Sequence, residues 1–180
     1  MIFETPRLIV RPWTLDDAEA AFEIYGDPRV MEPLHSKPTK SLEEQREWLA
    51  ALIARNAERP HGLGGWAIER KSDGRVLGTC LLKPLPDDTR VEVGWHLGRA
   101  YWGNGYATES GAGALALGFE KRGLDEIFAI VDPENAPSQR VCARLGMSVL
   151  EVTDRYHGMS LLLYRLTRQD WQRNNSLDRE

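Results

Sequence analysis

The stretch from Arg99 to Glu109, with the sequence RAYWGNGYATE, constrains the fold more than any other part of this chain. It follows the apolar run 91–97 and opens a long segment of helical composition. A strand that ends in a glycine-bearing turn and then starts a helix points several backbone N–H groups at one place, where the helix dipole adds partial positive charge. Gly103 and Gly105 lack a Cβ, so the backbone can bend sharply and approach a ligand closely. The pattern predicts a phosphate-binding turn, although an ordinary strand-to-helix turn would carry the same glycines.

Length, charge and cysteine content restrict the class of protein. The chain has 180 residues, so we expect a single domain over residues 1–168, followed by a polar, fraying tail over residues 169–180. The net charge of −4 and the lack of a long Lys/Arg run argue against a nucleic-acid partner. Two cysteines, Cys80 and Cys142, without a paired framework favour a reducing, cytoplasmic setting. With no leader-like start and no apolar run of membrane-spanning length, we expect no membrane partner.

Residue periodicity predicts elements in the order β-α-α-β-β-β-α-β-α-β-β. The expected strands are 7–13, 66–70, 76–82, 90–97, 127–131, 147–152 and 160–166, and the expected helices are 14–25, 41–57, 107–121 and 135–145. The proline-bearing segment between the first two helices is expected to be irregular. Strand 90–97, helix 107–121 and strand 127–131 make a β-α-β crossover, so these two strands should be parallel neighbours. The sequence therefore predicts an α+β fold of three α/β/α layers, whose mixed, mostly antiparallel sheet contains a central parallel β-α-β unit.

Five sequence blocks together resemble one known family. They are TPRLIVRP (5–12), GWHL (94–97), YWGNGYATE (101–109), DPENAPSQRV (132–141) and LGM (145–147). In this order they resemble the GNAT superfamily of N-acetyltransferases, and most of all its branch of ribosomal-protein N-terminal acetyltransferases. The resemblance spans residues 5 to about 168. It implies acetyl-coenzyme A as the donor and a primary amine as the acceptor.

The resemblance also implies which residues hold the donor. The backbone amides of the loop would hold the pyrophosphate: Trp102, Gly103, Asn104, Gly105, Tyr106, Ala107 and Thr108. Trp102 replaces the Gln or Arg with which the superfamily's loop usually begins. Backbone groups near His96 and Leu97 would pair with the pantetheine arm, which Asn135 would also bond. Arg140 would lie near the adenosine end, with Arg99, Lys121 and Arg144 as further candidate cations that are otherwise ordinary surface side chains.

The chemistry needs a base, because an ammonium must lose a proton before it can attack a thioester. Glu92 is the first candidate, since it lies on the strand beside the thioester; the alternative is a solvent-facing strand glutamate. Glu109 is a weaker candidate, because an acid in the first helical turn also favours the dipole. Ser138 matches the branch's proposed proton donor to the leaving thiolate, or it caps its helix. Cys142 stands where many superfamily members have a tyrosine.

The acceptor is less constrained by the sequence. Segment 27–40 and the hairpin around Tyr156 and His157 should flank the amine pocket, with Glu32 and Asp154 as further candidates to attract a cation. The four histidines show no metal-ligand spacing, so we predict no metal. We expect the acceptor to be either a peptide N-terminus or a small molecule, and we expect direct attack without a covalent enzyme intermediate.

A broader alternative stays open. It is a non-catalytic acyl-CoA-binding or sensing module, which the missing tyrosine at Cys142 favours. The oligomeric state is also open, and we expect either a monomer or a homodimer.

Overall fold

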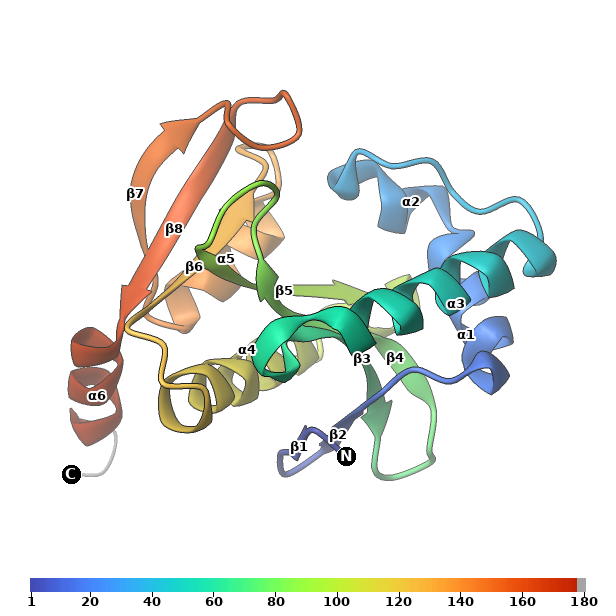
Figure 1. The fold of residues 1–180 in the computed structure, drawn as a ribbon, viewed down its shortest axis with the longest axis horizontal. Coiled ribbons are helices and arrows are strands. Elements are labelled where there is room, and N and C mark those ends of the chain that lie inside the picture. The colour runs from blue at the N-terminus through green and yellow to red at the C-terminus, as the bar shows by residue number, and fades with distance from the viewer. Residues whose placement is uncertain (178–180) are drawn as a thin grey trace.

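One mixed sheet organises the part of the chain that the computed structural model describes, residues 1–177 (Figure 1). Within these residues the sheet has eight strands in the order β1-β2-β3-β4-β5-β6-β8-β7. The strands are β1 (Phe3–Glu4), β2 (Leu8–Arg11), β3 (Gly64–Arg70), β4 (Val76–Pro84), β5 (Val91–Leu97), β6 (Glu126–Val131), β7 (Ser148–Thr153) and β8 (Leu161–Thr167). The pair β5/β6 is parallel and the other neighbouring pairs are antiparallel. The predicted crossover and sheet type are confirmed.

Helices cover both faces of the sheet, and each face has its own core. The α-helices are α1 (Ala18–Tyr25), α2 (Pro28–Met31), α3 (Leu42–Glu58), α4 (Tyr106–Ala116), α5 (Ala136–Arg144) and α6 (Arg168–Leu177). One cluster of buried apolar side chains comes from α1, α2 and α3 and packs on β3 and β4. A larger cluster joins α4 and α5 to the opposite face. The arrangement is therefore the predicted three-layer one, with α3 crossing in front of the strands in Figure 1.

Two segments are more regular than the sequence predicted. The segment after α1 contains α2 and the 3₁₀ turn η2 (Glu32–Leu34). Asp27 caps α2 by accepting a hydrogen bond from the Arg29 backbone N–H at 2.9 Å, and Pro28 occupies the first helical turn, where proline is tolerated. A proline-rich composition here marks helix starts rather than an irregular loop.

The expected fraying tail is helical over residues 168–177, and this prediction was wrong for that part. The Asp170 backbone N–H donates to Thr167 Oγ1 at 3.1 Å, and the Thr167 hydroxyl donates to Asp170 Oδ2 at 2.7 Å. Trp171 packs on Phe119, with ring centroids 5.3 Å apart. A helix cap and one aromatic anchor thus offset the polar composition of α6. The rest of the predicted tail, 178–180, lies outside the described residues.

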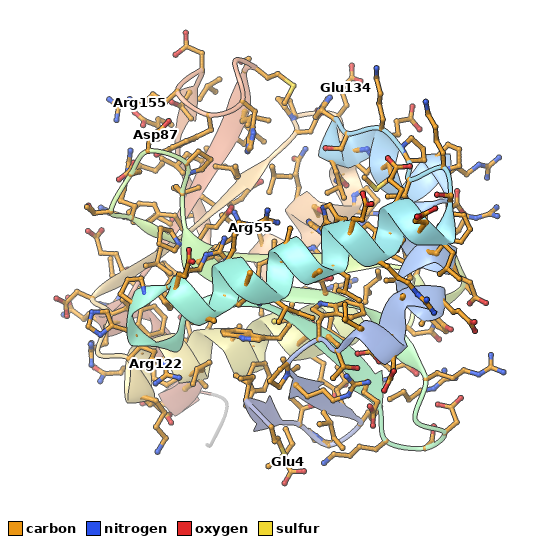
Figure 2. The ribbon with its side chains drawn as sticks, turned by 45° about the vertical axis from the view of Figure 1, so that its right-hand side comes forward. Glu4, Arg55, Asp87, Arg122, Glu134 and Arg155 are labelled. Atoms are coloured by element: carbon orange, nitrogen blue, oxygen red, sulfur yellow. The ribbon has the colours of Figure 1, made fainter. Side chains whose placement is uncertain are left out.

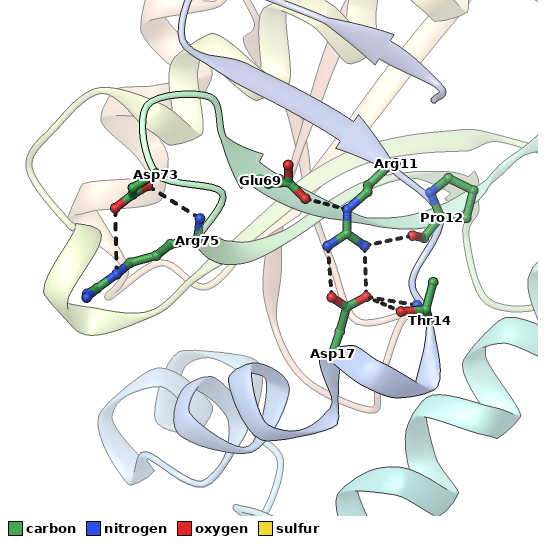
Figure 3. Close-up of polar contacts among 7 residues, drawn as sticks. All are labelled: Arg11, Pro12, Thr14, Asp17, Glu69, Asp73 and Arg75. Carbon is green, nitrogen blue, oxygen red and sulfur yellow. Dashed lines mark hydrogen bonds and ion pairs between the residues drawn. The ribbon is translucent and has the colours of Figure 1, made fainter.

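A half-buried charge cluster joins the first two layers of the fold (Figure 3). Arg11, on β2, donates to both carboxylate oxygens of Asp17 at 2.8 Å and to Glu69, on β3, at 2.6 Å. Burial raises the pKa of Asp17, but hydrogen bonds from Arg11 and Thr14 outweigh burial, so the pKa is lower than its ordinary value. The ionised pair fixes the start of α1 against the sheet, and α1 in turn carries Tyr25 to the site.

Candidate functional site

The site consists of two neighbouring cavities that meet at the end of β5. The loop cavity, about 350 Å³, lies between the turn 101–108, the end of β5 and the start of α5. The strand cavity, about 450 Å³, is lined by residues of α1, α2 and α3, of the strands β4, β5 and β6, and of the hairpin before β8. Six residues line both cavities: Pro33, Leu34, Trp95, His96, Asn135 and Ser138. Two molecules, one in each cavity, would therefore meet beside these residues.

The two parallel strands separate where the cavities meet. Their pairing consists of the bridge Glu92↔Phe128. The Gly98 backbone N–H donates to the Leu77 carbonyl on β4. Because backbone groups alternate in direction along a strand, the N–H and C=O groups of even-numbered residues of β5 point to β4, and those of odd-numbered residues point to β6. The backbone groups of Trp95 and Leu97 thus face the gap between the strands. His96 pairs with Thr79 on β4 instead, so its backbone does not face that gap, in contrast to the sequence-based expectation.

The turn before α4 has the geometry of an anion site. Gly103 and Gly105 have φ values of 76° and 80°, a left-handed conformation that favours glycine. Gly105 is the N-cap of α4, so the amides of Tyr106, Ala107 and Thr108 have no carbonyl partner within the helix. Thr108 Oγ1 is buried beside the loop cavity and has no hydrogen-bond partner among the described residues. A ligand with oxygen acceptors would satisfy all four groups.

Side chains hold this turn in place. Trp102 donates its indole N–H to the Leu97 carbonyl at 2.8 Å. Asn104 donates its side-chain amide to the carbonyls of Tyr101 and Trp102, and its own carbonyl accepts from Arg7. Asn104 does not line the loop cavity, unlike the other predicted loop residues. Its side chain therefore shapes the turn.

Among the predicted cations, Arg140 and Arg144 line the loop cavity. Arg99 and Lys121 do not, and Arg99 pairs with Asp27 at 2.9 Å. Both cavity-lining arginines lie on α5 and are exposed. They therefore place positive charge at the loop cavity, although the protein as a whole is acidic.

The start of α5 is fixed by Asn135, whose side-chain oxygen accepts from the Ser138 backbone N–H at 3.1 Å. Asn135 is the N-cap, and Ser138 contributes only its main-chain N–H to the cap. The Ser138 hydroxyl therefore does not cap α5, in contrast to the alternative considered from the sequence. The hydroxyl group belongs to a residue that lines both cavities.

Comparison with known proteins decides the family. Residues 7–148 match the family described as "Acetyltransferase (GNAT) domain". The chain belongs to the GNAT acetyltransferase family. The uncharacterized N-acetyltransferase p20 of Bacillus licheniformis is 30% identical over 143 residues, covering 79% of each chain. The uncharacterized protein YkkB of Bacillus subtilis is 35% identical over 126 residues, covering 69% of this chain and 71% of that protein.

Solved structures share the fold. A GNAT-family acetyltransferase from Bacillus anthracis superposes with a TM-score of 0.78 at 22% identity, covering 92% of this chain and 98% of the other. The ribosomal-protein-S5-alanine acetyltransferase from Vibrio fischeri gives a TM-score of 0.72 at 21% identity, covering 94% and 97%. This GNAT protein is an acetyl-CoA-dependent acetyltransferase, and the non-catalytic module is set aside. The orphaned Thr108 hydroxyl and the free amides of α4 fit the pyrophosphate of its co-substrate.

Glu92 is buried rather than solvent-facing. Its side chain is 8% exposed, and Lys83 Nζ lies 2.6 Å from its Oε1. Both residues line the strand cavity. Lys83 was missed from sequence, because it reaches Glu92 only through the antiparallel register that places them opposite each other on β4 and β5.

His96 lies between the two cavities in a half-buried hydrogen-bonded cluster. Its Nδ1 is 3.3 Å from the Tyr25 hydroxyl, which also bonds Thr79 Oγ1. Burial, and next the charge of Lys83, lower the pKa of His96 to about 4. The imidazole is therefore neutral near pH 7.

This cluster predicts a specific pH dependence of stability. The pKa of His96 is about 4 in the folded chain and about 6.5 when unfolded, so the unfolded chain binds the proton more tightly. The free energy of unfolding that depends on neutral His96 is fully present above pH 6.5 and is lost as the pH falls from 6.5 to 4. At pH 5 the loss amounts to about 2 kcal/mol. Urea unfolding at pH 7 and pH 5 should show His96→Gln losing less stability than wild type between the two, whereas His61→Gln should behave as wild type. Equal losses in wild type and His96→Gln would contradict the assignment.

Three other candidates are engaged elsewhere. Glu109 accepts hydrogen bonds from Thr5 and from the backbone and side chain of Arg7, which anchors β2 to α4. Cys142 is buried, and burial raises the pKa of its thiol to about 12, which leaves it protonated at neutral pH. Tyr156 is also buried and does not reach the cavity.

The hydroxyl of Tyr156 donates to Asp88 at 2.7 Å and accepts from Arg90 at 2.6 Å. This network braces the hairpin that ends at β8, while His157 of the same hairpin lines the strand cavity. Segment 27–40 also lines that cavity, through residues from Met31 to Thr39.

In residues 1–177, no helix is both long and apolar enough to cross a membrane. In the same residues, no group of three or more His, Cys, Asp or Glu side chains is arranged to hold a metal ion. The expectation of a metal-free reaction stays a prediction.

Proposed function

We propose that the protein transfers the acetyl group from acetyl-CoA to the nitrogen of a primary amine by direct attack. The observation that carries this proposal is the meeting of the two cavities at Trp95, His96, Asn135 and Ser138, where β5 and β6 separate. The donor enters through the loop cavity and the amine through the strand cavity. Well-oriented reactants gain about 7–11 kcal/mol from such positioning.

The donor is held along the loop cavity. The backbone amides of Gly103, Gly105, Tyr106, Ala107 and Thr108, together with the Thr108 hydroxyl, bind the pyrophosphate. The Trp102 amide donates to the Arg99 carbonyl instead, and Arg140 lies toward the adenosine end of the donor. The pantetheine arm extends along the separated edge of β5, where Asn135 and the backbone of Trp95 and Leu97 offer hydrogen bonds. A backbone N–H on this edge is available to the thioester oxygen as its charge grows.

The proton transfers are assigned to two side chains. Glu92 accepts the proton that the ammonium must lose, because its carboxylate lines the strand cavity, where the amine binds, and the ion pair with Lys83 fixes its position. The Ser138 hydroxyl, from the helix that borders both cavities, donates to the leaving sulfur. The new N–C bond forms as the C–S bond breaks, and no enzyme group is acylated.

The test is an acceptor screen with acetyl-CoA. Purified protein is mixed with a panel of small amines and short peptides, thiol release is followed by absorbance, and the products are examined by mass spectrometry. We expect an acetyl group on nitrogen for at least one amine. Acetylation confined to hydroxyl or thiol acceptors, or thiol release that is the same with and without any acceptor, would refute the proposal.

Ser138→Ala should lower kcat by about ten-fold or more while the Kd for acetyl-CoA stays within about two-fold. The helix cap is unaffected, since Ser138 contributes only its backbone N–H to Asn135. Steady-state kinetics and calorimetric titration check both quantities, with Ser148→Ala, at the start of the distant strand β7, as the matched control. A wild-type kcat in Ser138→Ala would assign the proton donor to water instead.

A further inference from the structure

The Lys83–Glu92 ion pair lies on the sheet side of the strand cavity. The two side chains are 23% and 8% exposed, and their charged atoms are 2.6 Å apart. An ammonium has three donors and a carboxylate about four acceptor positions, so one mutual contact leaves most of this capacity unused. Neither side chain forms another hydrogen bond with residues 1–177. The cavity thus presents a positive and a negative group side by side, each able to bind a further ligand atom.

A ligand with the same charge pattern in reverse satisfies both groups at once. An ammonium and a carboxylate on adjacent atoms would place the ammonium on Glu92 and the carboxylate on Lys83. The four charges would then alternate in sign around a closed ring. A neutral amine lacks the carboxylate, and a peptide N-terminus offers only a neutral carbonyl at that position, which is a weaker acceptor for an ammonium.

The remaining walls indicate what the rest of the ligand is like. Met31, Trp48, Leu81, Met159 and Leu161 line the same cavity, so they surround an attached side chain with apolar surface. Removing apolar surface from water is favourable, which favours an apolar side chain there.

One contact across the rim limits the ligand's size. His35, which follows η2, and Asp132, which follows β6, lie 2.5 Å apart between Nε2 and Oδ2. The loop after β6, where Glu134 is labelled, lies beside the α2 segment in Figure 2. This bridge joins the two sides of the cleft, so an extended polypeptide has less room than a single small molecule.

From these features we infer that the acceptor is a free α-amino acid with an apolar side chain. The inference rests on the proposed function and specifies its substrate class. The α-ammonium gives one proton to Glu92 and its nitrogen then attacks the thioester carbon. The C–S bond breaks, the sulfur takes a proton from the Ser138 hydroxyl, and the second nitrogen proton replaces the proton that Ser138 gave up as the amide forms. Lys83 holds the carboxylate throughout and is a positioning and specificity residue.

The experiment compares matched acceptors. L-Leucine, L-methionine and L-phenylalanine are each assayed beside their carboxamides, with isopentylamine and the dipeptide Leu-Gly as further acceptors. We expect kcat/KM for at least one amino acid to exceed that for its own carboxamide by about ten-fold or more, because only the acid has a carboxylate for Lys83. Carboxamides, isopentylamine or Leu-Gly acetylated as well as the amino acids would overturn the inference and leave the proposed function intact. Failure of every amine would overturn both.

Variants test the role of Lys83 by the ratio of the two kcat/KM values, which does not depend on how much of a variant is folded. Lys83→Met should bring the ratio of acid to carboxamide close to one, and Lys83→Arg should keep most of the preference. Lys121→Met, at an exposed position that lines neither cavity, should keep the wild-type ratio. A wild-type ratio in Lys83→Met would overturn the inference. If Lys83→Met does not fold, the wild-type comparison of acids with carboxamides decides.

Discussion

Glu92→Gln should lower kcat by about 10²–10⁴-fold, the usual range for loss of a general base. Glutamine has nearly the same shape as glutamate, so the packing of this buried position on β5 is retained. What is lost is the negative charge beside Lys83 and the ability to take a proton from the acceptor. The Kd for acetyl-CoA should stay within about two-fold, because Glu92 lines only the strand cavity.

The pH profile separates a base from a merely structural residue. In wild type the rate should fall at low pH as the base becomes protonated, and in Glu92→Gln that limb should flatten. Glu44→Gln is the matched control, since Glu44 lines the same cavity but is exposed at its rim. Wild-type rates across the low-pH limb in Glu92→Gln would remove Glu92 as the base and leave an ordered water in that role.

Gly105→Asp should weaken acetyl-CoA binding by about 100-fold, equivalent to roughly 2.7 kcal/mol. The new carboxylate would stand at the N-cap of α4, beside the amides that we assign to the pyrophosphate. It would repel the phosphates and would itself accept from those amides. Calorimetric titration with acetyl-CoA or coenzyme A measures the change.

Backbone strain needs its own control, because Gly105 has a φ of 80°. Gly123→Asp introduces the same residue at a φ of 70°, in open space away from both cavities. Thermal unfolding should show a comparable loss of stability in both variants, since both force aspartate into the left-handed region. Gly123→Asp should keep its affinity for acetyl-CoA. Unchanged affinity in Gly105→Asp would refute the assigned loop.

The features that could be predicted from sequence are those set by local patterns. The crossover from β5 through α4 to β6 follows from an apolar run, a glycine turn and an alanine-rich helix in succession. The turn at Gly103 and Gly105 was found in the same way, since their left-handed conformation is one that glycine favours. The N-cap role of Asn135 likewise depends on residues three positions apart.

The features that could not be predicted depend on register and on side-chain direction. Lys83 and Glu92 are nine positions apart in sequence and meet only because β4 and β5 pair in one register. The cluster of Tyr25, Thr79 and His96 joins a helix to two strands. A polar hairpin gave no sign that Tyr156 turns inward to Asp88 and Arg90. Such contacts follow from the packed fold and leave no periodic signal in the chain.

If the donor binds as proposed, where β5 separates from β6, it becomes a structural part of the sheet. Because the bridge Glu92↔Phe128 is the pairing between β5 and β6, the strands β1–β5 and the strands β6–β8 form two parts of the sheet that share few main-chain hydrogen bonds. The amide groups of a bound donor would form hydrogen bonds with both strands and so connect the two parts of the sheet. The protein should accordingly melt at a higher temperature when saturated with coenzyme A, so its own reagent serves as a removable strand.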